Sequence, residues 1–216
     1  MKINFLGDSI TEGAGATLAQ NRYVNVVKEL LGCEVRNYGV SGTRFARQSK
    51  YSPANVWDYD FMMRMEIMAN IDPDADFVFV FGGTNDFGHG DAPLGKLGDK
   101  TPYTFYGATA IIAEFLLQKY GKDKLCFMLP IRRHREDNVM GDGGNKKEPG
   151  PILCEYVAAI VDVLEHYGVS YIDLFNNFLP TPMLGGASEY FVDGLHPNDK
   201  GHRMIAERVV EYVRSR

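Results

Sequence analysis

Short apolar runs alternate with segments of helical hydrophobic spacing along the whole chain. The apolar runs predict five strands, at residues 3–6, 34–38, 76–81, 125–129 and 170–174. Apolar residues that recur every three or four positions predict helices, at residues 24–31, 56–68, 103–120, 151–167 and 198–213. This repetition of strand and helix is the signature of a doubly wound sheet, so we expect a single α/β domain over residues 1–216.

The segment Asp76–Phe81 is the clearest strand, because its apolar character is almost continuous. Such a strand is typical of a parallel sheet that is covered by helices on both faces. In sheets of this kind, functional residues lie in the loops beyond the carboxyl ends of the strands. Polar and glycine-rich clusters follow three of the predicted strands, at residues 7–9, 39–42 and 82–86, and we expect the functional site there.

A serine follows the first strand, and an aspartate and a histidine stand three residues apart near the other end of the chain. They are Ser9, Asp193 and His196. A serine hydroxyl is a weak nucleophile until a base accepts its proton, and a third group must fix the tautomer of that base. A single turn ending at Pro197 can set the Asp193 carboxylate against the His196 imidazole. We therefore expect these residues to meet as a nucleophilic triad.

Acyl transfer also needs hydrogen-bond donors for the oxyanion that develops in the transition state. The candidates are the backbone N–H groups of Ser9 and Gly42 and the side-chain amide of Asn85. Glycine at position 42 allows the backbone to approach a ligand closely. Asn85 directly follows the clearest strand, which predicts a rigid position for its amide.

These residues stand in motifs that resemble those of the SGNH hydrolases, the superfamily of GDSL-type esterases and lipases. The motifs occur in the family order and span nearly the whole chain: Gly7-Asp8-Ser9 with isoleucine instead of leucine at position 10, Gly42, Gly83-Thr84-Asn85-Asp86, and Asp193-x-x-His196. The resemblance implies a three-layer, flavodoxin-like α/β/α sandwich and serine esterase chemistry without a metal or another cofactor. It also implies that Ser9, Gly42 and Asn85 line the oxyanion hole.

Four more side chains are candidate substrate contacts because they lie in loops at the same edge of the predicted sheet: Asp8, His89, Arg132 and His134. For Asp8, a structural role as a helix cap or a brace of the Ser9 loop is the favoured alternative. Two other histidines, His166 and His202, lie in helical patterns and are expected at the surface or its boundary.

Composition and charge limit the classes of partner that the protein is expected to bind. A net charge of −5 excludes nucleic acid as the main partner, because phosphate binding needs a concentrated basic surface. No apolar run approaches 18 residues, so no membrane span is expected. Cys33, Cys126 and Cys154 lack metal-ligand spacing, which favours buried, inert thiols in a reducing compartment. Without a signal-peptide core near the first residue, we expect a cytoplasmic protein. No pattern indicates an oligomeric state.

The chemistry of these residues predicts a serine ester hydrolase that works through an acyl-enzyme. The polar loops at residues 87–102 and 131–150 favour a small acyl group on a hydrophilic alcohol, such as an acetylated sugar. Within them, residues 136–150 are expected to be mobile. Two alternatives remain: a thioesterase or lysophospholipase on the same scaffold, and a non-catalytic module that binds carbohydrate or a partner. The filled catalytic positions argue against the second alternative.

Overall fold

The computed structural model describes residues 1–49, 60, 61, 63, 71–142, 146, 148–177 and 187–216. Its sheet has five parallel strands in the order β2-β1-β3-β4-β5. The strands are β1 (Lys2–Gly7), β2 (Glu34–Gly39), β3 (Phe77–Phe81), β4 (Leu125–Met128) and β5 (Ser170–Ile172). The predicted parallel α/β sheet is confirmed. Only its last strand is clearly shorter than expected, because Leu174 already begins a short helix.

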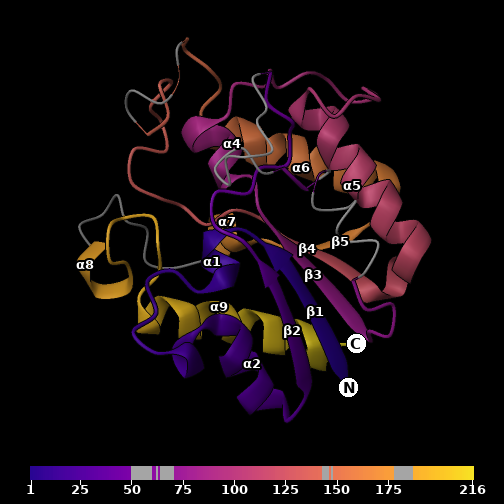
Figure 1. Cartoon of the computed structure of the whole chain (residues 1–216), viewed down its shortest axis with the longest axis vertical. Helices are drawn as coiled ribbons and strands as arrows, with labels where there is room; N and C mark the ends of the chain where they lie inside the picture. Colours follow the sequence, from indigo (N-terminus) through magenta and orange to yellow (C-terminus); the bar gives the residue numbers. More distant parts are fainter. Residues whose placement is uncertain (50–59, 62, 64–70, 143–145, 147, 178–186) are drawn as a thin grey trace.

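Two layers of helices cover the sheet, as Figure 1 shows. On one face, α2 (Tyr23–Leu31) packs against α9 (Asp199–Arg214). On the other face, α5 (Phe105–Tyr120) packs against α6 (Leu153–Tyr167). The described chain therefore has the three-layer α/β/α arrangement that the family resemblance implied. None of its described helices is long and apolar enough to cross a membrane.

The central strand β3 supplies side chains to both cores. Val78 and Val80 lie in the cluster that includes residues of α5 and α6, whereas Phe79 and Phe81 lie in the cluster that includes residues of α2 and α9. All four side chains are buried, which confirms the expectation that both faces of this strand are covered. Full burial of each such side chain contributes about 1.5–3 kcal/mol to folding.

The helix boundaries differ from the predictions in two informative places. Pro151 was expected in the first turn of its helix, but Ile152 is the N-cap of α6, so the proline precedes the helix. Asn198 was expected inside the last helix, but it is the N-cap of α9, and its side chain accepts hydrogen bonds from Lys200 and Gly201. The helix predicted at residues 56–68 lies largely outside the described residues. Within it, Phe61 is described and buried.

Short helices that the hydrophobic pattern does not predict follow several strands or lie in the connecting segments. They are α1 (Ser9–Glu12), α4 (Thr84–His89), α7 (Leu174–Asn177), α8 (Ala187–Tyr190) and the 3₁₀ turns η1 (Ala19–Asn21) and η3 (Lys122–Lys124). Helices of three to six residues are too short to show an amphipathic period. Two of them, α1 and α4, carry residues of the candidate site.

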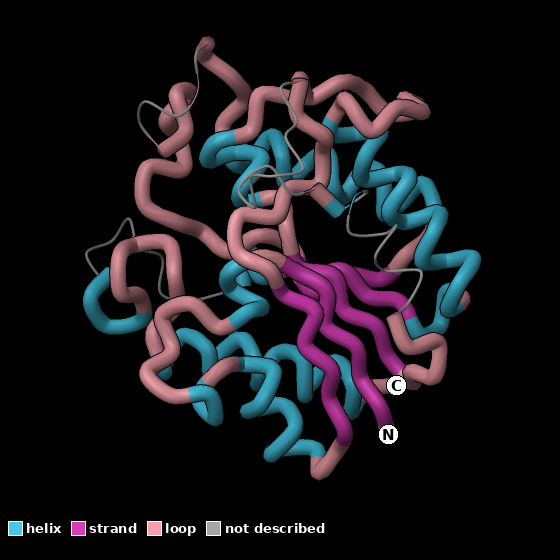
Figure 2. Tube along the Cα trace, in the orientation of Figure 1, coloured by secondary structure: helices cyan, strands magenta, loops and turns pink. Residues whose placement is uncertain are grey.

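The register of the sheet brings the site segments together. Gly7 at the end of β1 pairs with Gly39 at the end of β2 and with Phe81 at the end of β3. The three strands therefore end level, and the segments that follow them start side by side. The strand order also reverses at this point, between β1 and β3, which is where ligands bind in open α/β sheets. Figure 2 shows helices and loops gathered beyond this end of the strands, opposite the chain termini.

Candidate active site

Ser9 lies at the turn from β1 into α1. Asp8 is the N-cap of this helix, and its Oδ1 accepts a hydrogen bond of 3.0 Å from the Ile10 N–H. This contact gives Asp8 the structural position that the sequence favoured, and the carboxylate is buried. The Ser9 residue is only 7% exposed, so its hydroxyl has a defined surrounding at the carboxyl edge of the sheet.

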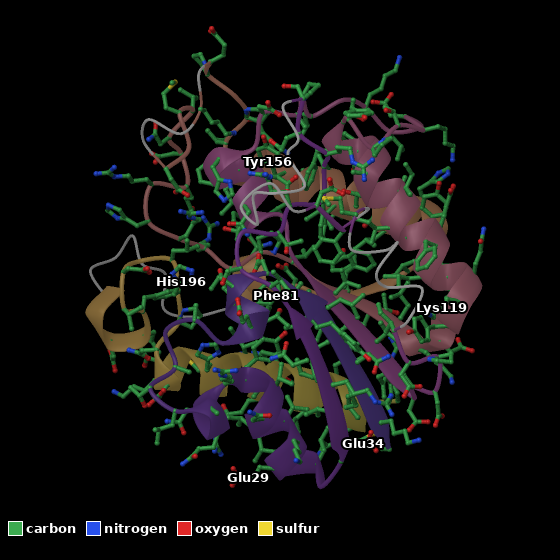
Figure 3. The ribbon with its side chains drawn as sticks, in the orientation of Figure 1. Glu29, Glu34, Phe81, Lys119, Tyr156 and His196 are labelled. Carbon is green, nitrogen blue, oxygen red and sulfur yellow. The ribbon has the colours of Figure 1, made fainter. Side chains whose placement is uncertain are left out.

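The Asp193–His196 turn lies next to Ser9. The Ser9 Oγ is 3.0 Å from the His196 Nε2, and the His196 Nδ1 is 2.7 Å from the Asp193 Oδ2. A carboxylate at Nδ1 favours the tautomer with its proton on that nitrogen. The lone pair of Nε2 then faces the serine hydroxyl. The structure therefore brings together the three residues that the sequence placed at opposite ends of the chain. Figure 3 shows where His196 lies relative to Phe81 at the end of β3.

The Asp193 carboxylate is held mainly by its own turn. Its Oδ1 accepts hydrogen bonds of 2.9 Å and 2.7 Å from the backbone N–H groups of Leu195 and His196. Partial burial acts to raise the pKa of Asp193, but the hydrogen bonds from His196 and Leu195 outweigh it and hold the pKa below its usual value. Gly194, at φ 81°, supplies the left-handed conformation that this turn requires. Asp193 is therefore ionised at neutral pH.

The segment after β2 contributes Gly42. Its φ of 76° lies in the left-handed region that favours glycine. The neighbouring Ser41 donates its backbone N–H to the Glu12 carboxylate at 2.8 Å, which ties this segment to α1. Gly42 is therefore fixed beside the helix that begins with Ser9.

Asn85 lies in α4, directly after β3. Its Nδ2 donates a hydrogen bond of 3.0 Å to the Thr43 carbonyl, so the amide is tied to the segment that carries Gly42. An amide nitrogen has two hydrogens, and this bond uses one of them. Asn85 is buried and its amide cannot rotate freely.

A histidine fixes the orientation of that amide. His89 Nδ1 is 2.7 Å from an Arg44 guanidinium nitrogen, and its Nε2 is 3.1 Å from the Asn85 Oδ1. Arginine can only donate, so Nδ1 accepts and the Nε2–H donates to Asn85. Burial, together with the charges of Arg44, Arg133 and Lys146, lowers the pKa of His89 to about 4, which keeps the ring neutral. The sequence placed His89 in a loop, but it is the last residue of α4.

Asp86 was missed as a site residue, although it stands in the same motif as Asn85. Its Oδ2 and Oδ1 each accept a hydrogen bond of 2.8 Å, from the backbone N–H groups of Phe45 and Ala46. Burial raises the pKa of Asp86 to about 7, although these hydrogen bonds act in the opposite direction. Asp86 thus holds the segment after Gly42 against α4.

The model of the GDSL-like lipase/acylhydrolase family matches residues 5–204. The chain belongs to this family. It is a carboxylic ester hydrolase. A comparison with curated proteins finds no match.

Solved structures of similar proteins agree with the family. A protein from Lactobacillus plantarum is 31% identical, with a TM-score of 0.81 over 99% of this chain and 96% of that chain. A possible lipase from Chitinophaga pinensis is 21% identical, with a TM-score of 0.72 over 99% and 98% of the two chains. An acetyl xylan esterase is 22% identical, with a TM-score of 0.66 over 99% and 100%. The last two likenesses concern the fold.

Two of the candidate substrate contacts follow β4 in this GDSL-like hydrolase. His134 is exposed, and its backbone N–H donates a hydrogen bond of 2.8 Å to the Gly194 carbonyl, so it lies against the Asp193–His196 turn. Arg132 forms an ion pair with Glu136, and its guanidinium lies 4.2 Å from the centre of the Phe175 ring. The structure thus places His134 beside the triad and shows Arg132 engaged with neighbouring side chains.

The segment 136–150, which was expected to be mobile, makes specific contacts in its first part. Arg133 is buried, bonds to the Thr84 hydroxyl at 3.2 Å and forms an ion pair with Asp142. The Asp142 N–H also donates to the Gly88 carbonyl at 2.8 Å. Asp142 of the hydrolase is therefore held against α4. In the described part of the chain, no group of three His, Cys, Asp or Glu side chains has a metal-binding arrangement.

Proposed function

We propose that this hydrolase uses Ser9, His196 and Asp193 as a catalytic triad. The observation that carries the proposal is the chain of two contacts, 3.0 Å from Ser9 Oγ to His196 Nε2 and 2.7 Å from His196 Nδ1 to Asp193 Oδ2. Both lie within the range expected of a nucleophile, its base and the group that orients the base. Ser9 is the nucleophile, His196 the general base, and Asp193 the residue that orients and stabilises the imidazolium.

The reaction proceeds in two steps, acylation of Ser9 and hydrolysis of the acyl-enzyme. The Ser9 oxygen attacks the ester carbonyl carbon while His196 Nε2 accepts the hydroxyl proton. The bond to the alcohol oxygen then breaks, and His196 returns the proton to the leaving alcohol. Water attacks the acyl-enzyme in the same way, with its proton passing to His196 and then to Ser9. The products are the carboxylic acid and the alcohol.

The oxyanion that forms in both steps of the reaction is held by the backbone N–H groups of Ser9 and Gly42 and by the second Nδ2 hydrogen of Asn85. The first hydrogen is held by Thr43, which supports this orientation. Each such donor contributes about 2.7–4 kcal/mol to the transition state, or roughly 100- to 1000-fold in rate.

The substrate is a short acyl ester of a hydrophilic alcohol, such as an acetylated sugar. Polar side chains support this choice, because Gln48, Ser49, Asp91 and Glu148 line a cavity beside His89. Hydroxyl groups of a sugar can bond to such side chains, whereas a long alkyl chain cannot.

The test is a p-nitrophenyl ester series from acetate to palmitate, with the wild type, Ser9→Ala and Ser215→Ala. Ser215 is an exposed serine at the end of α9 and serves as the control. We expect turnover to fall by at least about 10⁴-fold in Ser9→Ala only, and the wild type to prefer acetate. Activity retained in Ser9→Ala would contradict the assignment of the triad. A preference for long acyl chains would contradict the proposed substrate and indicate a lipase or a thioesterase instead.

A further inference from the structure

A cavity of about 520 Å³ adjoins the oxyanion side of the site. Its wall includes Arg44 and His89 and also Lys146 and Tyr156. His89 also bonds to Asn85, so only one side chain separates the cavity from the amide that faces the reacting ester. Figure 3 shows Tyr156 beyond the carboxyl end of β3, which is marked by Phe81.

Lys146 is an unusual residue to find in this wall. It is only 8% exposed, and its ammonium lies 5.2 Å and 5.7 Å from the ring centres of Tyr156 and Phe87. Its Nζ bonds to the Tyr156 hydroxyl oxygen at 3.3 Å. Within the residues that the structure describes, no carboxylate lies within the 4.0 Å that defines an ion pair with this Nζ. A buried ammonium without a counter-charge is costly for the protein.

The nearest acids do not neutralise Lys146 because each serves another partner. Asp86 receives the N–H groups of Phe45 and Ala46, and Asp142 pairs with Arg133. The attraction of both acids is weaker than the effect of burial, which lowers the pKa of Lys146. The site thus contains a cation whose hydrogens are only partly satisfied by the residues that the structure describes.

Tyr156 adds a donor at the same point. Lysine can only donate, so the Tyr156 oxygen accepts from Lys146 and keeps its own hydrogen. An ammonium and a phenol hydroxyl that point into one cavity can bind two oxygens of a carboxylate or phosphate. Asp91 and Glu148 are exposed and repel free anions, and the exposed Ser49 and the buried Gln48 offer partners to hydroxyl groups. This arrangement suits an anionic group on a hydroxylated molecule better than a bare ion.

We propose that the cavity is a substrate subsite for an anionic group, a carboxylate or a phosphate, on the alcohol part of the ester. Lys146 and Tyr156 bind this group, and Arg44 provides further positive charge in the same wall. The substrate class is therefore an acylated, acidic, hydroxylated alcohol, such as an acetylated sugar acid or sugar phosphate. This inference rests on the proposed function of Ser9.

The test compares acetate release from a monoacetylated methyl glucoside, the matching methyl glucuronide and the matching glucoside 6-phosphate. We expect the wild type to favour at least one acidic ester over the neutral one by roughly 10- to 100-fold in kcat/KM, as for a charge-assisted hydrogen bond. The preferred acidic ester identifies the group. In Lys146→Met the ratio of kcat/KM between the acidic and the neutral ester falls to about one, and in Tyr156→Phe this ratio falls partly. Lys28→Met, at an exposed lysine of α2, keeps it.

The result that overturns the subsite is a wild type without preference for either acidic ester, or a preference that survives Lys146→Met. Methionine removes the buried charge and keeps the length of the side chain, so this variant is expected to fold, and Tyr156→Phe provides the second, milder test. Failure of the proposed function is a separate result, because hydrolysis of all three esters would then persist in Ser9→Ala. Loss of the preference with Ser9-dependent turnover intact affects only the subsite.

Discussion

The Asp193–His196 turn and the Gly42–Asn85 side of the active site differ in the reach of their supporting contacts. The Asp193 carboxylate bonds to residues two and three positions away, and its side chain is 51% exposed. Asn85 and Asp86 bond instead to the segment 43–46, about forty positions earlier, and both are buried. The proposed base is therefore held locally, whereas the proposed oxyanion donors are held by tertiary structure. Substitutions in the Asp193–His196 turn should therefore alter the reaction rate alone. Substitutions on the Gly42–Asn85 side should alter the reaction rate and the stability together.

Asp193→Asn should give the largest effect and leave folding almost untouched. Asparagine keeps an oxygen for the N–H groups of Leu195 and His196 but favours the wrong tautomer of the imidazole. We expect kcat on p-nitrophenyl acetate to fall by roughly 10³- to 10⁴-fold, while the free energy of unfolding in urea changes by less than about 1 kcal/mol.

Asp123→Asn, in the 3₁₀ turn η3 at the opposite edge of the sheet, is the matched control and should change neither quantity. A large loss of stability in Asp193→Asn would contradict the local character of the turn. Nearly full activity of Asp193→Asn would contradict the assignment of Asp193 to the triad.

Asp86→Ala should show the opposite pattern, with a loss of stability as its main effect. It leaves the buried N–H groups of Phe45 and Ala46 without acceptors. Each costs about 1–3 kcal/mol, so we expect the free energy of unfolding to fall by roughly 2–6 kcal/mol. For a chain of this size that lowers Tm by roughly 4–24 °C.

The comparison variant is Asp193→Ala. Here we expect the free energy of unfolding to fall by less than about 1 kcal/mol, because the hydrogen bonds of Asp193 to its backbone partners are exposed to water. Equal losses of stability in the two alanine variants would show that the two sides of the site do not differ as described.

The same contrast explains what the sequence could predict. The triad residues follow a strand end or share one turn, so short motifs identify them, and the apolar runs identified all five strands. The bracing of Asn85 depends on Arg44 and His89, whose contact joins positions 45 residues apart. No local pattern encodes such a contact, and His89 was therefore interpreted as a substrate contact.

Two predictions about individual side chains were wrong. His202 was expected at the surface or its boundary, but it is buried, accepts the Tyr23 N–H and donates to the Ala14 carbonyl. Its helical pattern could not reveal partners 179 and 188 positions earlier. Cys154 was expected to be buried, but it lies on the exposed side of α6, where a short apolar side chain needs no cover. Periodicity identifies a helix more reliably than it assigns individual polar or small side chains to a face.

The smallest predicted effect, at His89, tests whether tertiary bracing acts through Asn85. His89→Ala removes one of the two hydrogen bonds that orient the Asn85 amide, and we expect kcat to fall by about tenfold, or 1.4 kcal/mol of barrier, with little change in KM. Asn85→Ala removes the donor itself and should cost roughly 100- to 1000-fold. In the double variant, His89→Ala should add almost nothing, because it has no amide left to orient. If the two losses in rate multiply instead, His89 acts on the reaction independently of Asn85. His89→Gln, whose amide nitrogen can donate to the Asn85 oxygen, should restore part of the rate, which a purely structural role of the imidazole would not explain.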